Sequence, residues 1–235
     1  MIIDVSHHNG VIDWKLVGTQ IDYAIIRCGY GTNSPNHDDK QFNYNATQCE
    51  KFGIPYGVYI YSYATSLHQC ESEINHILRC VKNRRVIYPL YYDIEENVTF
   101  ESGLAKQFAY MFIDKVRKEG YKAGIYSGDY NFLRNFNDIN CDSKWVARYN
   151  NVPPQSNYDI WQYSSKGRLI GLTGNVDCNA LEDSSLFSKA HYESYVDAIL
   201  DNDYGTGVNR KNALFNEGIN YWYMQTLVNK RLRGK

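Results

Sequence analysis

Two carboxylates separated by one residue, Asp93 and Glu95, have the type and spacing that acid–base chemistry needs. They end the segment 88–96, in which Pro89 is followed by aliphatic and aromatic strand formers. Side chains alternate along a strand, so both carboxylates point to the same side. Like charges this close raise the pKa of one carboxyl group and keep it protonated near neutral pH. Glycoside hydrolysis uses such a pair, although a solvated acidic turn has the same sequence.

The elements around this pair alternate between short β-branched or aromatic runs and longer segments of helical period. This alternation predicts parallel strands with helices outside them. We expect Gly53 to end one helix as a C-cap, and the helix at 66–82 to turn Glu71, Glu73 and Lys82 to solvent. The expected strands are 2–5, 23–28, 55–61, 88–96, 122–126, 145–148, 159–163 and 176–179, and the expected helices are 13–17, 39–52, 66–82, 102–119 and 129–136.

The pattern changes after the fifth strand. The segment around Pro153 and Pro154 is shorter than the dozen or so residues that a parallel crossover needs, and 164–175 is Gly-rich without helical period. Five βα units followed by three helix-poor strands predict an α/β fold, a modified TIM-like (β/α)5(β)3 barrel. In such barrels the active site lies at the carboxyl ends of the strands.

Several polar residues then share one register at the ends of these strands. Each has a simpler explanation: Asp4 could cap the first turn, Asp177 could be a turn residue, and Arg27 could neutralise an acid. Four carboxylates at one mouth are nevertheless costly unless a site uses them. The residues expected at the mouth are Asp4, Arg27, Tyr61, Asp93, Glu95, Tyr126, Gln162 and Asp177.

Composition excludes several classes of function. The 235 residues carry a formal charge of −1, so no basic field attracts nucleic acid. Six cysteines form no Cys-x-x-Cys pair, and the neighbours His7 and His8 lack the spacing of a metal pair, so we expect neither metal nor cofactor. The N-terminus has no signal-peptide pattern and no run spans a bilayer, so we expect synthesis in the cytoplasm and no membrane partner.

Eight short motifs, in order along residues 1–182, resemble glycoside hydrolase family 25, the Chalaropsis-type lysozymes. After the third strand the chain departs from the family's usual residues, with the run Tyr59-Ile60-Tyr61-Ser62-Tyr63-Ala64-Thr65 in their place. The motifs are 4–14, Asp39-x-x-Phe42-x-x-Asn45, 57–59, 93–95, 124–127, 145–149, 161–164 and Gly174-Asn175-Val176-Asp177-x-Asn179.

The resemblance implies an N-acetylmuramidase that cleaves the β-1,4 bond between N-acetylmuramic acid and N-acetylglucosamine in peptidoglycan. It implies Glu95 as the general acid and Asp93 as the group that steadies the substrate's 2-acetamido group. Asp4 and Asp177 are implied to flank the site, and Tyr61, Tyr126 and Gln162 to contact the sugar. A protein nucleophile, direct attack by water and substrate assistance all remain open.

The C-terminal part follows an expected linker at 183–190 and has the apolar spacing of three short helices. Residues 203–214, together with Tyr221, Gln225, Val228 and Asn229, resemble the helical cell-wall-binding repeat of some phage lysozymes. The resemblance places Gly205, Gly207, Arg210 and Gln225 in a wall-binding module over 191–235. A helical cap packed on the barrel, or an oligomerisation element, has the same pattern.

Together these features favour a phage-type endolysin with peptidoglycan as its partner. Self-association through the C-terminal module would add avidity. A bacterial autolysin would have the same catalytic residues. A peptidoglycan-binding protein without hydrolytic activity is the alternative from another class, and the intact Asp93 and Glu95 argue against it.

Overall fold

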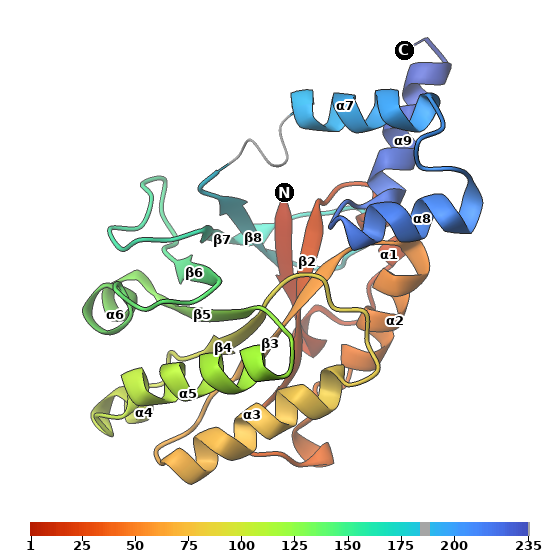
Figure 1. Ribbon diagram of the computed structural model, residues 1–235. Helices are drawn as coiled ribbons and strands as arrows, with labels where there is room; N and C mark the ends of the chain where they lie inside the picture. The colour runs from red at the N-terminus through yellow and green to blue at the C-terminus, as the bar shows by residue number, and fades with distance from the viewer. Residues whose placement is uncertain (184–188, 235) are drawn as a thin grey trace.

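The computed structural model describes residues 1–183 and 189–234, and a closed barrel of eight strands lies at its centre (Figure 1). Each strand pairs with the next along the chain, and β8 closes the barrel against β1. The first seven strands are parallel, whereas β8 is antiparallel to both neighbours. The predicted α/β barrel is confirmed. The strands are β1 Ile2–Val5, β2 Tyr23–Tyr30, β3 Tyr56–Tyr61, β4 Leu90–Asp93, β5 Ala123–Gly128, β6 Ser143–Ala147, β7 Ile160–Gly167 and β8 Val176–Leu181.

Helices cover the outside of the barrel between the first six strands. Helix α2 ends at Gly53 in the left-handed conformation, with φ 69°, so the predicted C-cap is confirmed. The expected helix at 102–119 begins at residue 105, after a short helix and a turn at Gly103. The helices are α1 Trp14–Val17, α2 Phe42–Phe52, α3 Leu67–Val81, α4 Asn97–Glu101, α5 Ala105–Lys118 and α6 Asp129–Asn135, with 3-10 turns at His7–Asn9 and Pro35–His37.

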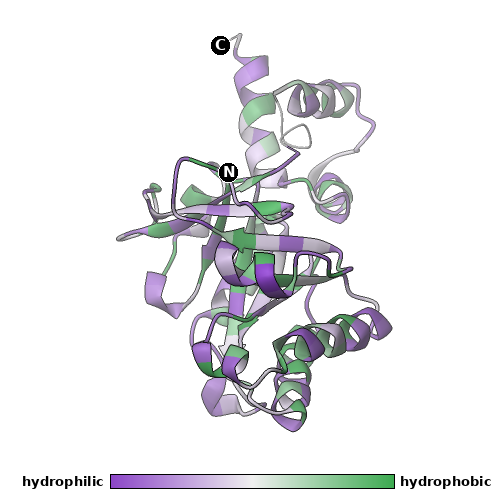
Figure 2. Cartoon of the chain, turned by 90° about the vertical axis from the view of Figure 1, so that its left-hand side faces the viewer, coloured by the Kyte–Doolittle hydropathy of each residue, from purple (hydrophilic) through white to green (hydrophobic). Residues whose placement is uncertain are grey.

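The alternation of side chains along each strand produces two apolar layers. One set of strand residues faces the helices and forms the larger core, which includes Ile3, Ile26 and Tyr92. The other set fills the barrel interior, where Tyr91 and Trp145 are fully buried. Figure 2 shows hydrophobic strands at the centre and mixed hydropathy along the surrounding helices. Because one face of each strand points inward, the polar residues predicted for the mouth share the interior with this aromatic layer.

Two sequence-based expectations were wrong. Strands β6 and β7 are parallel although residues 148–159 between them contain no helix, because an extended loop provides the crossover. Glu73 does not face solvent but is 1% exposed, on the same face of α3 as Cys70, Ile74 and Ile77. Its carboxylate accepts hydrogen bonds from the hydroxyls of Ser62 and Tyr92, at 2.7 and 2.5 Å, and from the Tyr63 amide, at 2.9 Å.

The C-terminal part forms three helices with a small core of their own: α7 Lys189–Leu200, α8 Gly207–Asn216 and α9 Tyr221–Leu232. The predicted linker at 183–190 lies mostly outside the described residues. Along the described helices, none combines the length and apolar character that crossing a bilayer requires.

The three helices pack against the amino-terminal end of the barrel (Figure 1). Buried Asn220 donates to the carbonyls of Gly18 and Ile21, at 3.0 and 2.8 Å, just before β2 begins. The Tyr88 hydroxyl, just before β4, donates to the carbonyl of Gly218 at 2.9 Å. The helices therefore lie at the end of the barrel opposite the carboxyl ends of its parallel strands.

Candidate active site

The predicted mouth residues come from neighbouring strands and meet at the carboxyl end of the barrel. Strand β8 runs antiparallel, so its beginning, with Asp177, lies at the same end as the last residues of the parallel strands. In the ladder Asp4 pairs with Asp177, and Asp93 lies between Tyr61 and Tyr126. The strand register thus brings three of the four carboxyl groups together, and Glu95 follows two residues beyond Asp93.

Gln162 organises one side of this mouth through its amide. Its oxygen accepts hydrogen bonds from the hydroxyls of Tyr126 and Tyr149, at 2.8 and 2.9 Å. This orientation directs the NH2 group to Asp4 at 2.9 Å and to Asp177 at 3.4 Å. Gln162 is therefore a buried support for the two carboxyl groups, with its hydrogen bonds already made inside the protein.

Asp4 and Asp177 form a closely coupled pair. Burial and the neighbouring charge of Asp177 raise the pKa of Asp4, although Asn179 and Gln162 donate hydrogen bonds to it. Burial likewise raises the pKa of Asp177. Because two carboxylates in one low-dielectric site repel each other, the pair retains a proton at pH values where isolated aspartates are ionised.

Asp93 lies deeper and is 4% exposed. Burial, followed by the charges of Glu95 and Asp4, raises its pKa well above the usual range, whereas Arg27 acts in the opposite direction. Within the described part of the chain, its Oδ1 atom has no hydrogen-bond partner. A buried carboxyl oxygen without a partner is costly, and a donor on a bound ligand would satisfy it.

Glu95 is exposed at the rim of the mouth, unlike Asp4 and Asp93. Partial desolvation by the surrounding protein raises its pKa, contact with Tyr61 lowers it, and the charges of Glu96 and Asp177 raise it further. The Tyr61 hydroxyl itself donates to Glu96 at 2.7 Å. Glu95 is thus a carboxylic acid with a raised pKa that remains accessible to a large substrate.

Arg27 makes its side-chain contacts with residues outside the carboxyl cluster, Asp39 and His7. Its Nε donates to buried Asp39 at 3.0 Å, and its NH2 group lies 2.6 Å from Nδ1 of His7. Burial works against ionisation of Asp39, but hydrogen bonds from His7 and Gln41 and the charge of Arg27 lower its pKa. The partner of Arg27 is therefore Asp39, and it acts on Asp93 only through the electric field.

A cavity of about 310 Å³ lies beside the mouth, over the ends of β2 and β3. Tyr61 connects the two, because its ring lines this cavity and its hydroxyl bonds to Glu96. Aromatic rings with hydroxyl tips provide flat apolar faces and hydrogen bonds, which suits a sugar. The lining residues are His7, His8, Arg27, Tyr30, Tyr61 and Tyr63.

In the C-terminal helices, Arg210 and Gly205 come together, since the Arg210 Nε donates to the Gly205 carbonyl at 2.9 Å. Gly205 and Gly207 both have positive φ, 64° and 57°, which explains glycine at the turn before α8. Gln225 instead bonds along its own helix, to Asn229 at 3.1 Å.

Sequence reasoning did not select three residues that hold this site together. Asn179 donates to Asp4 at 2.8 Å while its oxygen accepts from the Trp145 indole at 2.7 Å. Tyr149 and Asp39 support Gln162 and Arg27. Strand alternation could have predicted Asn179, because it is two residues after Asp177 and so faces the same side of the strand. Asp39 and Tyr149 lie in loops, where alternation gives no direction.

Comparison with known proteins agrees with this geometry. Residues 3–172 match the family described as glycosyl hydrolases family 25. The chain belongs to that family. A separate match, the CW_7 repeat, covers residues 193–232, which are the three C-terminal helices.

Relatives of this chain include YegX of Escherichia coli O157:H7. The two are 25% identical over a region that covers 85% of this chain and 74% of YegX. The catalytic domain of endolysin ply40, from bacteriophage P40 of Listeria monocytogenes, is 27% identical with a TM-score of 0.70, covering 78% of this chain and 93% of that one. The modular autolysin LytC of Streptococcus pneumoniae is 29% identical with a TM-score of 0.64, covering 76% and 45% of the two chains.

Proposed function

We propose that this glycoside hydrolase is an N-acetylmuramidase that cleaves the β-1,4 bond between N-acetylmuramic acid and N-acetylglucosamine in bacterial peptidoglycan. The observation that carries the proposal is the difference in solvent exposure between Glu95 and the other carboxyl groups of the mouth. Glu95 is an exposed acid with a raised pKa, whereas Asp4 and Asp93 are buried behind it. The likeness to a phage endolysin and to a modular autolysin supports a cell-wall substrate.

In this proposal Glu95 donates its proton to the glycosidic oxygen as the bond to the leaving sugar breaks. Asp93 accepts a hydrogen bond from the N–H of the substrate's 2-acetamido group through its free Oδ1. The acetamido carbonyl oxygen then attacks the anomeric carbon, and the Glu95 carboxylate later removes a proton from the water that opens this intermediate. Burial of Asp93 keeps water away from its Oδ1 atom, so the N–H of the substrate is the donor that this oxygen would receive.

Asp4 and Asp177 keep negative charge and a shared proton close to the reacting groups. Coulombic repulsion from Asp177 contributes to the raised pKa of Glu95, after desolvation and the opposing contact with Tyr61. Gln162, held by Tyr126 and Tyr149, fixes the positions of both aspartates. In this scheme Tyr61 and the aromatic cavity beside it contact the sugar chain.

We further propose a phage-type endolysin in which residues 1–182 are the catalytic part and 191–235 bind the cell wall. The match of 193–232 to the CW_7 repeat and the resemblance of the catalytic part to endolysin ply40 support this division. The Gly205 turn with Arg210 is the surface we assign to wall binding.

Analysis of reaction products tests the bond specificity. Purified peptidoglycan is digested, the new ends are reduced with borohydride, and the fragments are identified by mass spectrometry. The proposal predicts reduced N-acetylmuramic acid at every new end. Reduced N-acetylglucosamine would mean that the barrel cuts the other glycosidic bond, and bound but undigested wall would favour a binding protein.

A further inference from the structure

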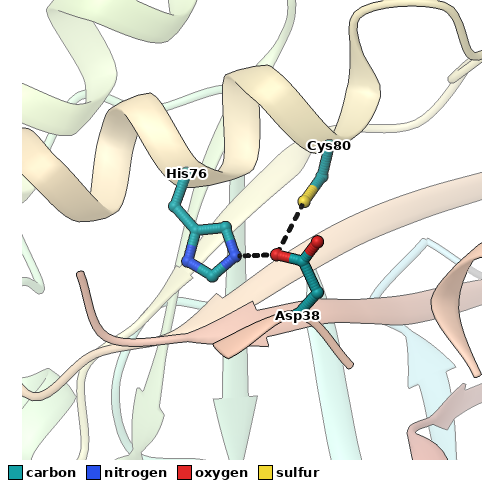
Figure 3. A group of neighbouring side chains, drawn as sticks. All are labelled: Asp38, His76 and Cys80. Atoms are coloured by element: carbon teal, nitrogen blue, oxygen red, sulfur yellow. Dashed lines mark hydrogen bonds and ion pairs between the residues drawn. The ribbon is translucent and has the colours of Figure 1, made fainter. Parts of the chain in front are cut away.

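Three side chains of metal-binding types meet outside the mouth, between α3 and the loop that follows β2 (Figure 3). Asp38 comes from the loop, whereas His76 and Cys80 come from α3. His76 Nε2 lies 2.8 Å from Asp38 Oδ1, and Cys80 Sγ lies 4.0 Å from the same oxygen. All three ligand atoms are within 4.8 Å of one another. A separation of four residues places His76 and Cys80 on one face of the helix.

The His76 ring is fixed in an orientation that suits a ligand. Its Nδ1 bonds to the Gly31 carbonyl at 3.0 Å, and because a carbonyl only accepts, Nδ1 carries the proton. Nε2 therefore faces Asp38 and Cys80. A backbone carbonyl that holds the distal ring nitrogen is the usual support of a metal-bound histidine.

Strand β2 has room for this ring only because residue 29 is glycine. A Cβ atom at Gly29 would lie 2.7 Å from His76 Cε1 and 2.8 Å from Nε2, closer than atoms pack. The ring itself is fully buried, whereas Asp38 and Cys80 are half-buried, which leaves access from solvent.

Two further groups face the cluster. Arg79 forms an ion pair with both oxygens of Asp38, and its Nε donates to Asn33 at 2.7 Å. The half-exposed Arg79 side chain can stay hydrogen-bonded to Oδ2 of Asp38 while Oδ1 of the same carboxylate binds a cation. Carboxylates that bind metals are themselves commonly hydrogen-bonded. The Cys80 thiol also donates to the backbone carbonyl of buried Cys28 on β2, at 4.0 Å.

We propose that Asp38, His76 and Cys80 bind one zinc ion. Thiolate, imidazole and carboxylate are the zinc ligands of proteins, and their atoms in a tetrahedral site lie close together, as they do here. The soft sulfur and the imidazole disfavour magnesium and calcium. Binding releases the protons of the Cys80 thiol and of His76 Nε2 to solvent.

The bound ion would have a structural role, which is independent of the proposed muramidase activity. The ion would join α3 to the loop at 31–39, whose next residue after Asp38 is Asp39, the partner of Arg27. Zinc would then stabilise the folded chain, raising its Tm by about 5 °C at a hundredfold excess over Kd.

The test uses the full chain without a polyhistidine tag, reduced and stripped of metal with a chelator. Zinc is titrated in competition with a chromophoric chelator, and Co²⁺ is then substituted to read thiolate ligation from its near-ultraviolet charge-transfer band. We expect one equivalent of zinc, a thiolate–Co²⁺ band and the rise in Tm. Cys80→Ser and His76→Gln should each weaken binding about 100-fold or more. Cys141→Ser, at another half-buried thiol, should leave it unchanged.

Each contrary result overturns the proposal. Binding that is equal in all variants, without a thiolate band, would place the cation elsewhere, for instance at the mouth carboxylates. A Cys28–Cys80 disulfide in peptides mapped without reduction, combined with no zinc uptake by reduced protein, would make the thiols a redox pair. Circular dichroism checks the folding of each variant, and the Co²⁺ spectrum of the wild type decides the question if a variant unfolds.

Discussion

Glu95 differs from the other carboxyl groups of the mouth because it combines a raised pKa with exposure. Asp4 is buried, and Asp93 meets the substrate only through the hydrogen bond that we propose for its Oδ1 atom. Because burial also raises the pKa of Asp93, it is exposure and not the pKa that distinguishes Glu95 as the proton donor. The division of roles between Glu95 and Asp93 is therefore set by their different distances from solvent.

The pH profile should report the environment of Glu95. Activity requires the protonated acid, so a raised pKa extends activity to higher pH, and the alkaline limb follows loss of this proton. Contact with Tyr61 lowers the pKa of Glu95, so Tyr61→Phe should move the alkaline limb of kcat/KM upward. Tyr63→Phe, which lines the same cavity, is the control and should leave the limb in place. A downward shift for Tyr61→Phe would contradict the assignment.

Asp4 should make the protein less stable at neutral pH. Its pKa is raised in the folded state by burial and by Asp177, so the folded chain holds this proton more tightly than the unfolded chain. Stability is then greatest below the unfolded pKa of about 3.9 and falls as pH rises toward the folded pKa. Asp4→Asn should raise the free energy of unfolding at pH 7 by about 1 kcal/mol or more.

Urea denaturation at several pH values measures this difference. The gain from Asp4→Asn should disappear below about pH 4, where Asp4 is protonated in both states. Asp201→Asn, at an exposed site, serves as the control and should change stability by less than about 0.5 kcal/mol. A gain that is constant with pH would show that packing, and not ionisation, is responsible.

At the scale of elements, buried Asn220 is one of the side chains that join the three C-terminal helices to the barrel. Asn220 satisfies two backbone carbonyls before β2 and also caps α9, where its oxygen accepts from the Tyr223 amide at 3.0 Å. Asn220→Ala should lower the free energy of unfolding by about 1–3 kcal/mol, because it leaves buried carbonyls without donors. Thermal denaturation measures this. Exposed Asn229→Ala should cost less than about 0.5 kcal/mol, and equal losses would contradict the docking role.

The strands and their inward residues could be predicted because alternation fixes which side chains share a face. Asp4, Asp93, Gln162 and Asp177 were found in this way, and helix spacing also contained the signal for Glu73, which lies three residues after buried Cys70. The parallel pairing of β6 and β7 escaped prediction because a twelve-residue loop without a helix is rarely a crossover. The meeting of Asp38 with His76 and Cys80 depends on how a loop folds back, which no local pattern encodes.

At the scale of the whole molecule, the mouth and the C-terminal helices lie at opposite ends of the barrel (Figure 1). Phe215 of α8 belongs to the main core, and Arg85 lies 4.5 Å over its ring. A chain shortened to residues 1–186 should therefore remain folded with a lower Tm and lose retention on insoluble peptidoglycan. Sedimentation with purified wall, together with circular dichroism, checks both. Complete unfolding would make these helices a structural cap of the barrel.

The central claim is that Glu95 supplies the proton that breaks the glycosidic bond. The most direct measurement compares Glu95→Gln with Glu96→Gln, its neighbour, whose amide oxygen can still accept the Tyr61 hydroxyl. Turnover on purified peptidoglycan should fall about 10²–10⁴-fold for Glu95→Gln, with wall binding intact, and less than about tenfold for Glu96→Gln. If Glu95→Gln kept most of its activity, or if Glu96→Gln lost as much, the proton donor would be a different residue.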